Sequence, residues 1–300
     1  MKNHSKRNAL NRMDWFDYLN YLIMLVVIAC TIFPLYYCAI VSISNGAAVT
    51  RGEVVFAPVG FDTTAYKVIF RNSQILRSYG NTIYYTALGT VINIVLTILC
   101  AYPLSRPTLR GRKTLNFLFM LTMFVNGGMI PMYLQVKSLH LLDTIWSIVL
   151  PGAISTYNMI IMRSFFSSIP EEMHEAAEID GADHFQTLLL VVLPLSQTIL
   201  ATLVLFYAVG HWNSYLSALL YLSDTKKMPL QMIIRKLVID SDIANMTTAN
   251  AASSSGTDTL LTENKLKYAI VMISVLPMIV IYPFLQKYFV KGVMIGGVKG

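Results

Sequence analysis

The sequence contains six long intervals without a single Asp, Glu, Lys or Arg. A charged side chain in the middle of a membrane-spanning helix costs about 2.5–3.5 kcal/mol even on lenient insertion scales, so missing charge is the main signal of a span. Even the shortest interval can cross a hydrocarbon core of about 30 Å at about 1.5 Å per helical residue. We therefore expect an all-α integral membrane protein with six transmembrane helices. The intervals are Tyr18–Thr50, Ser78–Ser105, Thr114–Val136, Thr144–Met162, His184–Ser223 and Tyr268–Gln286.

The basic residues at the ends of these intervals predict the orientation. Four basic side chains precede the first interval, and four lie in the Arg106–Lys113 connection between the second and third. Short segments rich in Lys and Arg stay in the cytoplasm, so both termini are expected inside. We expect one transmembrane domain over residues 1–300. Its expected spans are about 19–43, 80–104, 115–136, 144–163, 196–222 and 267–287, with a cytoplasmic loop at 164–194 and extracytoplasmic loops at 44–79 and 223–266.

Composition excludes several other classes of protein. Hydrophobic residues make up 55% of the chain and charged residues only 13%, whereas soluble proteins average about 25% charged residues. This argues against an ordinary soluble enzyme, a disordered chain and a disulfide scaffold. Cys30, Cys38 and Cys100 lie in apolar runs without paired spacing, so no disulfide framework or metal site is expected. The net charge of +7 comes from basic residues scattered at the ends of apolar stretches, which argues against nucleic-acid binding.

The expected spans also limit the mechanism. Ion-coupled carriers usually need an ionisable group or a broken-helix ion site at membrane depth, and voltage sensors need repeated arginines. His211 is the one titratable exception, in the fifth expected span, and we expect it to pack or hydrogen-bond near a membrane interface rather than to relay protons. A membrane-embedded enzyme would need converging acids, histidines or a nucleophile, and the intervals offer none.

The connection between the fourth and fifth intervals is unusual for a cytoplasmic loop. Residues 167–183 contain six of the sixteen acidic residues and no Lys or Arg. Ser168 and Glu171 have the spacing of a capping box, Pro170 suits a first helical turn, and acids favour the positive end of a helix dipole. Gly181 can end such a helix in the left-handed conformation. The pattern predicts a short acidic helix.

A second short helix is expected directly after the first. Asp183 and Gln186 offer a second N-cap and capping box. Pro194 then marks the passage toward the fifth span. The segment as a whole therefore predicts a helix–turn–helix.

The first of these helices has features that favour contact with another protein. Ala176 and Ala177 leave room for a partner's side chains, and Glu175 offers a charge-assisted contact. A solvated connecting loop is the alternative, since surface acids are common and a short capped helix needs no partner.

The same residues resemble a known signature. Glu175-Ala176-Ala177, Gly181 and Leu193-Pro194 are similar to the EAA–Gly–LP pattern of membrane subunits of bacterial ATP-binding-cassette importers, in its expected place before the penultimate span. Three further segments resemble the maltose-type sugar permeases of this group, and among these the permeases for aldouronate and pectin-derived oligosaccharides. They are 124–131, 158–163 and 288–300.

This resemblance implies one permease of a type I importer, a multi-pass protein of the bacterial cell membrane. In such importers two homologous permeases form the pathway, two cytoplasmic ATPases drive it, and an extracytoplasmic solute-binding protein delivers an oligosaccharide. ATP and Mg²⁺ would bind to the ATPases, and no cofactor to this chain. The absence of a G-x-x-x-x-G-K-[ST] phosphate loop from the sequence agrees with a chain that is not itself an enzyme.

The resemblance also assigns roles to individual residues. Leu193 and Pro194 would hold the exit from the coupling segment, although Pro194 as a plain helix boundary is the alternative. The tail residues Gly296, Gly297 and Lys299 resemble a contact with the ATPases, for which a frayed terminus is the alternative. Coupling to the ATPases would fall to Glu175, Ala176, Ala177, Asp180 and Gly181.

Several polar and aromatic residues in the spans are candidates for the substrate pathway. Aromatic faces and hydrogen-bonding amides suit sugars, but tyrosines also form interfacial belts and asparagines also join helices. An ion-coupled or passive transporter without an ATPase partner is the alternative function, and it would leave the acidic, double-capped loop unexplained. The candidates are Asn126, Tyr133, Asn158, Tyr207 and Asn213.

Overall fold

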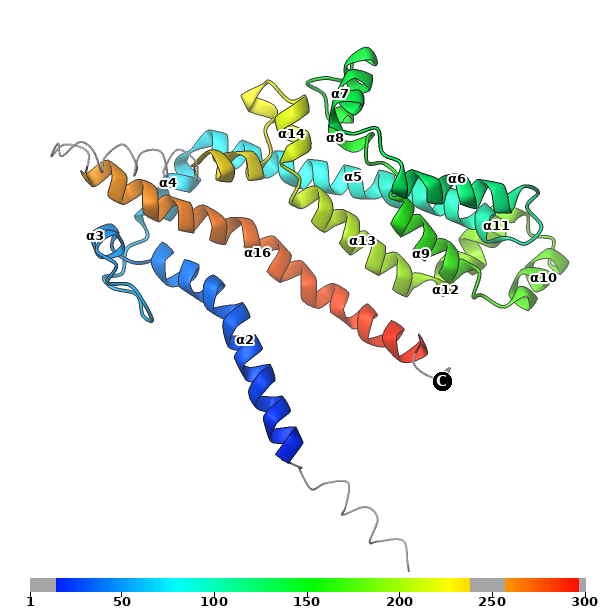
Figure 1. Ribbon diagram of the computed structural model, residues 1–300, viewed down its shortest axis with the longest axis horizontal. Helices are drawn as coiled ribbons and strands as arrows, with labels where there is room; N and C mark the ends of the chain where they lie inside the picture. Colours follow the sequence, from blue (N-terminus) through cyan, green and yellow to red (C-terminus); the bar gives the residue numbers. More distant parts are fainter. Residues whose placement is uncertain (1–14, 238–256, 297–300) are drawn as a thin grey trace, which may run out of the picture. The chain divides into compact units, whose positions relative to one another are not determined.

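The computed structural model describes residues 15–237 and 257–296, and these are helices joined by turns and loops, without a β-strand among them. Figure 1 traces their order along the chain. The chain divides into two compact units. One comprises residues up to Arg71 together with 237–274, and the other comprises Asn72–Lys236 together with the residues from Val275 onward. Each unit has its own buried apolar cluster.

The first unit is built around the end of the first long helix. Its apolar cluster joins Ile40 and Val41 to Ala48 and Val54 of the loop that follows. The long last helix begins in this unit and ends in the other. The helices of this unit are α2 (Trp15–Ser42), α3 (Gly46–Thr50), α4 (Thr64–Arg71) and the first part of α16 (Thr257–Gly296).

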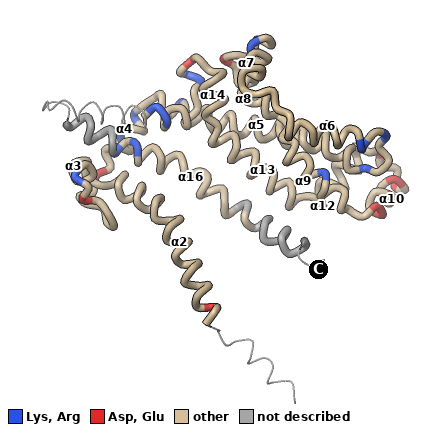
Figure 2. The backbone as a smooth tube through the Cα atoms, in the orientation of Figure 1, with Lys and Arg blue, Asp and Glu red and all other residues tan. Residues whose placement is uncertain are grey.

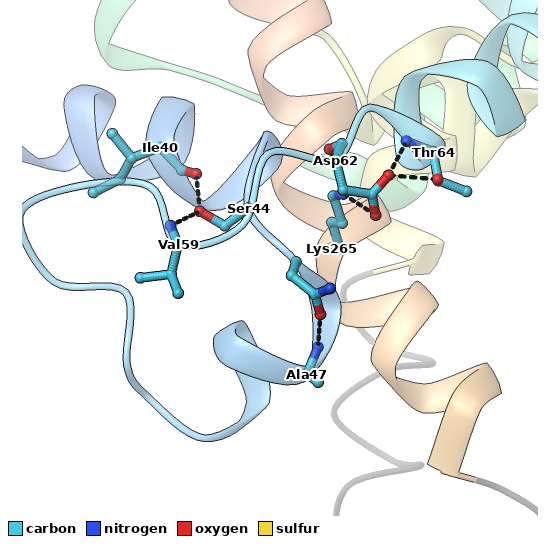
Figure 3. Close-up of polar contacts among 8 residues, drawn as sticks. Ile40, Ser44, Ala47, Val59, Asp62, Thr64 and Lys265 are labelled. Atoms are coloured by element: carbon cyan, nitrogen blue, oxygen red, sulfur yellow. Dashed lines mark hydrogen bonds and ion pairs between the residues drawn. The ribbon is translucent and has the colours of Figure 1, made fainter.

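Polar contacts fix the loop between α2 and α4 (Figure 3). Oγ of Ser44 accepts a hydrogen bond from the amide of Val59 at 3.2 Å, which closes the loop on itself. Oδ1 of Asp62 accepts a hydrogen bond from the amide of Thr64 at 2.9 Å. Nζ of Lys265, a buried residue of α16, lies 2.7 Å from Oδ2 of Asp62. The bond from Lys265 lowers the pKa of Asp62 to about 2, with help from Thr64. The loop is thus tied to the start of α16.

The second unit has the long helix α5 at its centre, packed against α13 and α9. Tyr102 and Phe166 meet edge to face with ring centroids 6.4 Å apart, and Met159 and Leu203 are fully buried beside them. His211 of α13 hydrogen-bonds to Asn93 of α5, and its expected place near a membrane interface stays a prediction. The elements of this unit are α5 (Ser73–Ser105), α6 (Arg112–Phe124), α7 (Met129–Ser138), α8 (Trp146–Val149), α9 (Thr156–Phe166), α10 (Glu171–Ile179), α11 (His184–Thr187), the π-helical turn η1 (Leu188–Val192), α12 (Leu193–Leu195), α13 (Gln197–Trp212), α14 (Leu216–Tyr221), the 3₁₀ turn η2 (Thr225–Lys227), a helical segment at 230–236 and the last part of α16.

The expected span at 115–136 is wrong as one continuous helix. It divides into α6 and α7, which meet at an angle of 113°. The cause is local: Oδ1 of Asn126 accepts a hydrogen bond from the amide of Gly128 at 2.8 Å, and Gly128 has φ +84°. Both features stop a helix, and glycine tolerates that backbone at little cost. The Asn-Gly-Gly run therefore marks a break inside an uncharged interval.

Two other expected spans are also interrupted. The 144–163 interval holds the short helix α8, a turn that contains Pro151 and Gly152, and then α9, which Ser155 caps. The 196–222 interval ends its first helix at Trp212 before α14 begins. Charge-free composition therefore does not require one straight helix.

Three helices are long and apolar enough to span a membrane by themselves among the described residues. They are Trp15–Ser42, Ser73–Ser105 and the Lys265–Pro283 part of α16. Two bent pairs raise the number to five if each pair is one span: α6 with α7, and His184–Leu195 with α13, the latter bent by 85°. The count of six and the orientation of the termini stay predictions.

Candidate functional site

The acidic segment forms a helix–turn–helix, but α10 begins differently from the prediction. Pro170 occupies its N-cap position without a side-chain cap, and Ser168 donates both its amide and its hydroxyl hydrogen bonds to the carbonyl of Phe165. The expected box between Ser168 and Glu171 is therefore wrong. Glu171 is instead held by Arg106, with Nη2–Oε1 at 2.7 Å and Nη1–Oε2 at 3.1 Å. A two-pronged guanidinium–carboxylate contact is stronger than a neutral capping bond, and it ties α10 to the end of α5.

One face of α10 is buried against its own unit. His174 and Ala177, three residues apart, are its buried side chains. The His174 ring lies 6.4 Å from the ring of Tyr102 of α5. Burial lowers the pKa of His174, and the nearby Arg106 charge acts in the same direction. The helix is thus seated by a neutral histidine. The expectation that Ala177 leaves room for a partner is wrong, because its methyl group faces this chain.

The end of α10 follows the prediction for Gly181. Gly181 has φ +78°. The amide of Ala182 donates to the carbonyl of Ala177 at 2.9 Å, and the amide of Gly181 donates to that of Glu178 at 3.0 Å. This pair of bonds is the Schellman motif, in which a left-handed residue closes a helix. The glycine therefore sets the direction in which the chain leaves α10.

The second helix also begins as predicted. Oδ1 of Asp183 accepts from the amide of Gln186 at 2.7 Å, and Oε1 of Gln186 accepts from the amide of Asp183 at 2.9 Å. After α11 the chain widens into the π-helical turn and passes Leu193 and Pro194 of α12. Leu193 packs on the core of the unit and Pro194 is exposed. The bend into α13 follows at Ser196.

The outer face of α10, opposite His174 and Ala177, combines acids with apolar surface. Ile179 has 85% of its surface exposed. Glu175, Ala176 and Asp180 are exposed as well. Figure 2 shows the acidic residues of α10 at the end of the unit where α6 begins. An exposed large aliphatic side chain among acids is typical of a surface that another protein covers.

The candidate pathway residues have different settings. The hydroxyl of Tyr207 lies 2.7 Å from Oγ1 of Thr97 and joins α13 to α5, and Asn158 is buried in α9. The side chain of Asn126 forms the break described above, the Tyr133 ring stacks on Tyr221 with centroids 6.2 Å apart, and Asn213 is exposed at the end of α13. Gly296 ends α16, whereas Gly297 and Lys299 lie outside the described residues. A role in the pathway or the tail contact stays a prediction for all of them.

The roles of Arg106, His174 and Ile179 in this site were not expected from the sequence. Arg106 lies 65 positions before Glu171, so spacing gave no signal for their contact. The buried pair of His174 and Ala177 could have been found from their three-residue spacing, and that spacing also leaves Ile179 on the opposite face.

Comparison with known proteins decides the family. Residues 93–295 match the protein family described as "Binding-protein-dependent transport system inner membrane component". The chain belongs to this family. Among curated proteins it is similar to protein LplC of Bacillus subtilis, with 41% identity over 95% of each chain. It is also similar to the polygalacturonan/rhamnogalacturonan transport system permease protein YtcP of the same organism, with 38% identity over 95% of this chain and 98% of YtcP.

A solved structure agrees with this assignment. It belongs to a bacterial ABC transporter involved in the import of the acidic polysaccharide alginate, and one of its chains matches with a TM-score of 0.82 and 36% identity. The match covers 91% of this chain and 96% of that chain. The family resemblance read from the sequence is thus confirmed. The chain has the fold and role of an ABC importer permease, a membrane subunit that is not itself the ATPase, and an ion-coupled or passive carrier is not favoured.

Proposed function

We propose that this permease forms half of the translocation pathway of an importer for acidic, uronate-containing oligosaccharides. It would pair with a second, homologous permease, receive substrate from an extracytoplasmic binding protein and be driven by two cytoplasmic ATPases that bind ATP and Mg²⁺. The acidic substrate class is supported by the similarity to YtcP, a polygalacturonan/rhamnogalacturonan permease, and to the importer of the acidic polysaccharide alginate.

A basic and aromatic pair at the start of α14 also supports an acidic substrate. The guanidinium carbon of Arg235 lies 4.4 Å from the ring centroid of Tyr215. Arg235 is exposed, and the exposed Asn213 precedes Tyr215 by two residues. A stacked guanidinium keeps its edge free for a carboxylate, and an amide suits sugar hydroxyls. These residues come from the loop side that we expect to face outward.

The proposal that this chain couples to the ATPases rests on the outer face of α10. The contact of Arg106 with Glu171 and the Schellman motif at Gly181 hold α10 rigidly on the unit, while Ile179 and the acids project away from it. Such a rigid element would sit in a cleft of the ATPase and pass nucleotide-driven closure to the helices as a rigid-body motion. Glu175, Ala176 and Ile179 would form the contact.

The test is attachment and uptake in the assembled complex. Glu175→Lys and Ile179→Asp should reduce ATPase recovered with the tagged permease by about tenfold at matched expression, since each removes a contact worth about 1–2 kcal/mol. Glu53→Lys, which makes the same charge change on a loop of the first unit, should have no effect. Normal attachment of both α10 variants would reject the coupling role.

The substrate class needs a separate measurement. The reconstituted complex should take up oligogalacturonates in preference to neutral oligosaccharides of equal length. Arg235→Gln should raise the KM for the acidic sugars several-fold without changing ATPase attachment. Equal uptake of neutral and acidic sugars would reject the substrate class but leave the coupling proposal intact.

A further inference from the structure

A cleft of about 800 Å³ lies between the start of α6 and the last turn of α9, within the second unit. The α6 side contributes Arg112 and Lys113, and α9 contributes Arg163. It is separate from the outer face of α10. The remaining residues that line it are Pro107, Leu109, Gly111, Asn116, Phe117 and Met120.

The charged side chains that line this cleft are all cationic. Arg112, Lys113 and Arg163 bring three positive charges to its wall, and no Asp or Glu lines it. None of the three has an ion pair among the described residues. Nε of Arg163 is buried without a hydrogen-bond acceptor. Buried charged donors are normally satisfied, so this group indicates an acceptor that the chain does not supply.

The backbone adds to the same positive field. Helix α6 begins at Gly111 without a side-chain cap. The amide of Arg112 donates to the carbonyl of Leu109, and the amides that follow it in the first turn remain available. First turns usually carry acids that offset the helix dipole, but this one carries Arg112 and Lys113. A local arrangement that disfavours the helix on its own is expected where an anion completes it.

The other part of the cleft is apolar and open. Phe117 is 63% exposed and Met120 48% exposed, and both lie on the face of α6 that continues from the cationic end. An inorganic anion would leave these side chains uncovered. The cleft therefore fits a ligand with an anionic head and a hydrocarbon tail.

We propose that this cleft binds one anionic phospholipid, with its phosphodiester between Arg112, Lys113 and Arg163 and an acyl chain along Phe117 and Met120. The site lies at the same end of the unit as α10, because the 106–111 connection that precedes α6 also carries the Arg106–Glu171 contact. Placing the lipid in the cytoplasmic leaflet rests on the proposed orientation. Basic pockets at the cytoplasmic ends of membrane helices suit anionic head groups.

The test uses the assembled importer in delipidated detergent solution, to which defined lipids are added while its Tm is recorded. Phosphatidylglycerol should raise the Tm in a saturable way, because a ligand that binds only the folded state stabilises it. Phosphatidylcholine, inorganic phosphate and glycerol phosphate should not. A shift from phosphate or glycerol phosphate equal to that from the lipid would overturn the assignment to a lipid.

Charge-neutral variants locate the site. The double variant Arg112→Gln/Arg163→Gln should need about 30-fold more phosphatidylglycerol for half of the shift. Lys113→Gln should need about fivefold more phosphatidylglycerol for half of the shift. Because Lys113 is exposed, this variant should fold normally and still tests the site if the double variant misfolds. Arg110→Gln should match the wild type, because Arg110 lines a different cavity of about 540 Å³.

An unchanged lipid requirement in the double variant and in Lys113→Gln would reject the site. Loss of ATPase attachment with an unchanged lipid requirement would instead make the cleft a protein contact.

Discussion

Nε2 of His211 lies 2.6 Å from Oδ1 of Asn93. The amide nitrogen of Asn93 donates to the carbonyls of Gly152 at 2.6 Å and Ala153 at 2.9 Å. Both hydrogens of the Asn93 amide nitrogen are used in these two bonds, so the atom that faces His211 is the amide oxygen. Because that oxygen can only accept, His211 must carry its hydrogen on Nε2. One buried amide thus joins α5, α13 and the turn between α8 and α9, and it fixes the histidine tautomer.

The close approach of α13 to α5 at this point predicts the effect of a methyl group. A Cβ added at Gly89 would lie 2.5 Å from Nε2 of His211. We expect Gly89→Ala to displace the histidine and to destabilise the protein by about 1–3 kcal/mol. Gly80→Ala is the matched variant, because Gly80 lies in the same helix with no atom within 4 Å of the added Cβ. It should be neutral or up to about 1 kcal/mol stabilising. The measurement is the Tm of each purified variant. Equal Tm values would contradict the close contact between Gly89 and His211.

The contact between Arg106 and Glu171 predicts a charge-swap result. Arg106→Glu and Glu171→Arg should each loosen α10, with a loss of about 1 kcal/mol, or about fivefold in ATPase attachment. The double swap restores opposite charges at the same positions and should recover part of the loss. The measurement is the amount of ATPase that co-purifies with each variant, relative to the amount of permease. Additive losses in the double variant would mean that the two residues act independently.

The contact between Asp62 and Lys265 predicts a pH dependence in the first unit. The pKa of Asp62 falls from 3.8 to about 2 on folding, so its contribution to stability is complete above the unfolded pKa and is lost as the pH falls toward the folded one. Asp62→Asn removes this contribution and leaves the buried Lys265 charge without its carboxylate. At about pH 6 the variant should therefore have the lower Tm, and the gap should narrow toward about pH 3. A gap that stays constant or widens on acidification would contradict the ion pair.

Sequence reasoning succeeded where a feature depends on neighbouring residues. The capping box of Asp183 and Gln186 and the helix end at Gly181 are set by backbone chemistry within a few residues. It failed where a distant group competes, since Arg106 takes the carboxylate of Glu171 that a local box would have used. It also failed at the break between α6 and α7, because missing charge reports the surroundings of a segment and not the path of its backbone.

Substitutions at Gly181 separate backbone geometry from side-chain bulk. An added Cβ at Gly181 meets no atom within 4 Å, so within this chain the cost of a side chain is conformational rather than steric. At φ +78° a β-branched residue costs about 1–2 kcal/mol, whereas asparagine adopts the left-handed region far more readily. Gly181→Val should therefore unwind the closure at Ala182 and turn α10 away from the axis of α11, while membrane insertion stays intact. ATPase attachment and oligosaccharide uptake should fall together.

Gly181→Asn should retain most of both, since it keeps the Schellman bonds and adds a side chain that points into open space. If Gly181→Asn fails as badly as Gly181→Val at matched expression, the outer surface at Gly181 itself touches the ATPase, and the loss comes from contact rather than from the angle between the two helices.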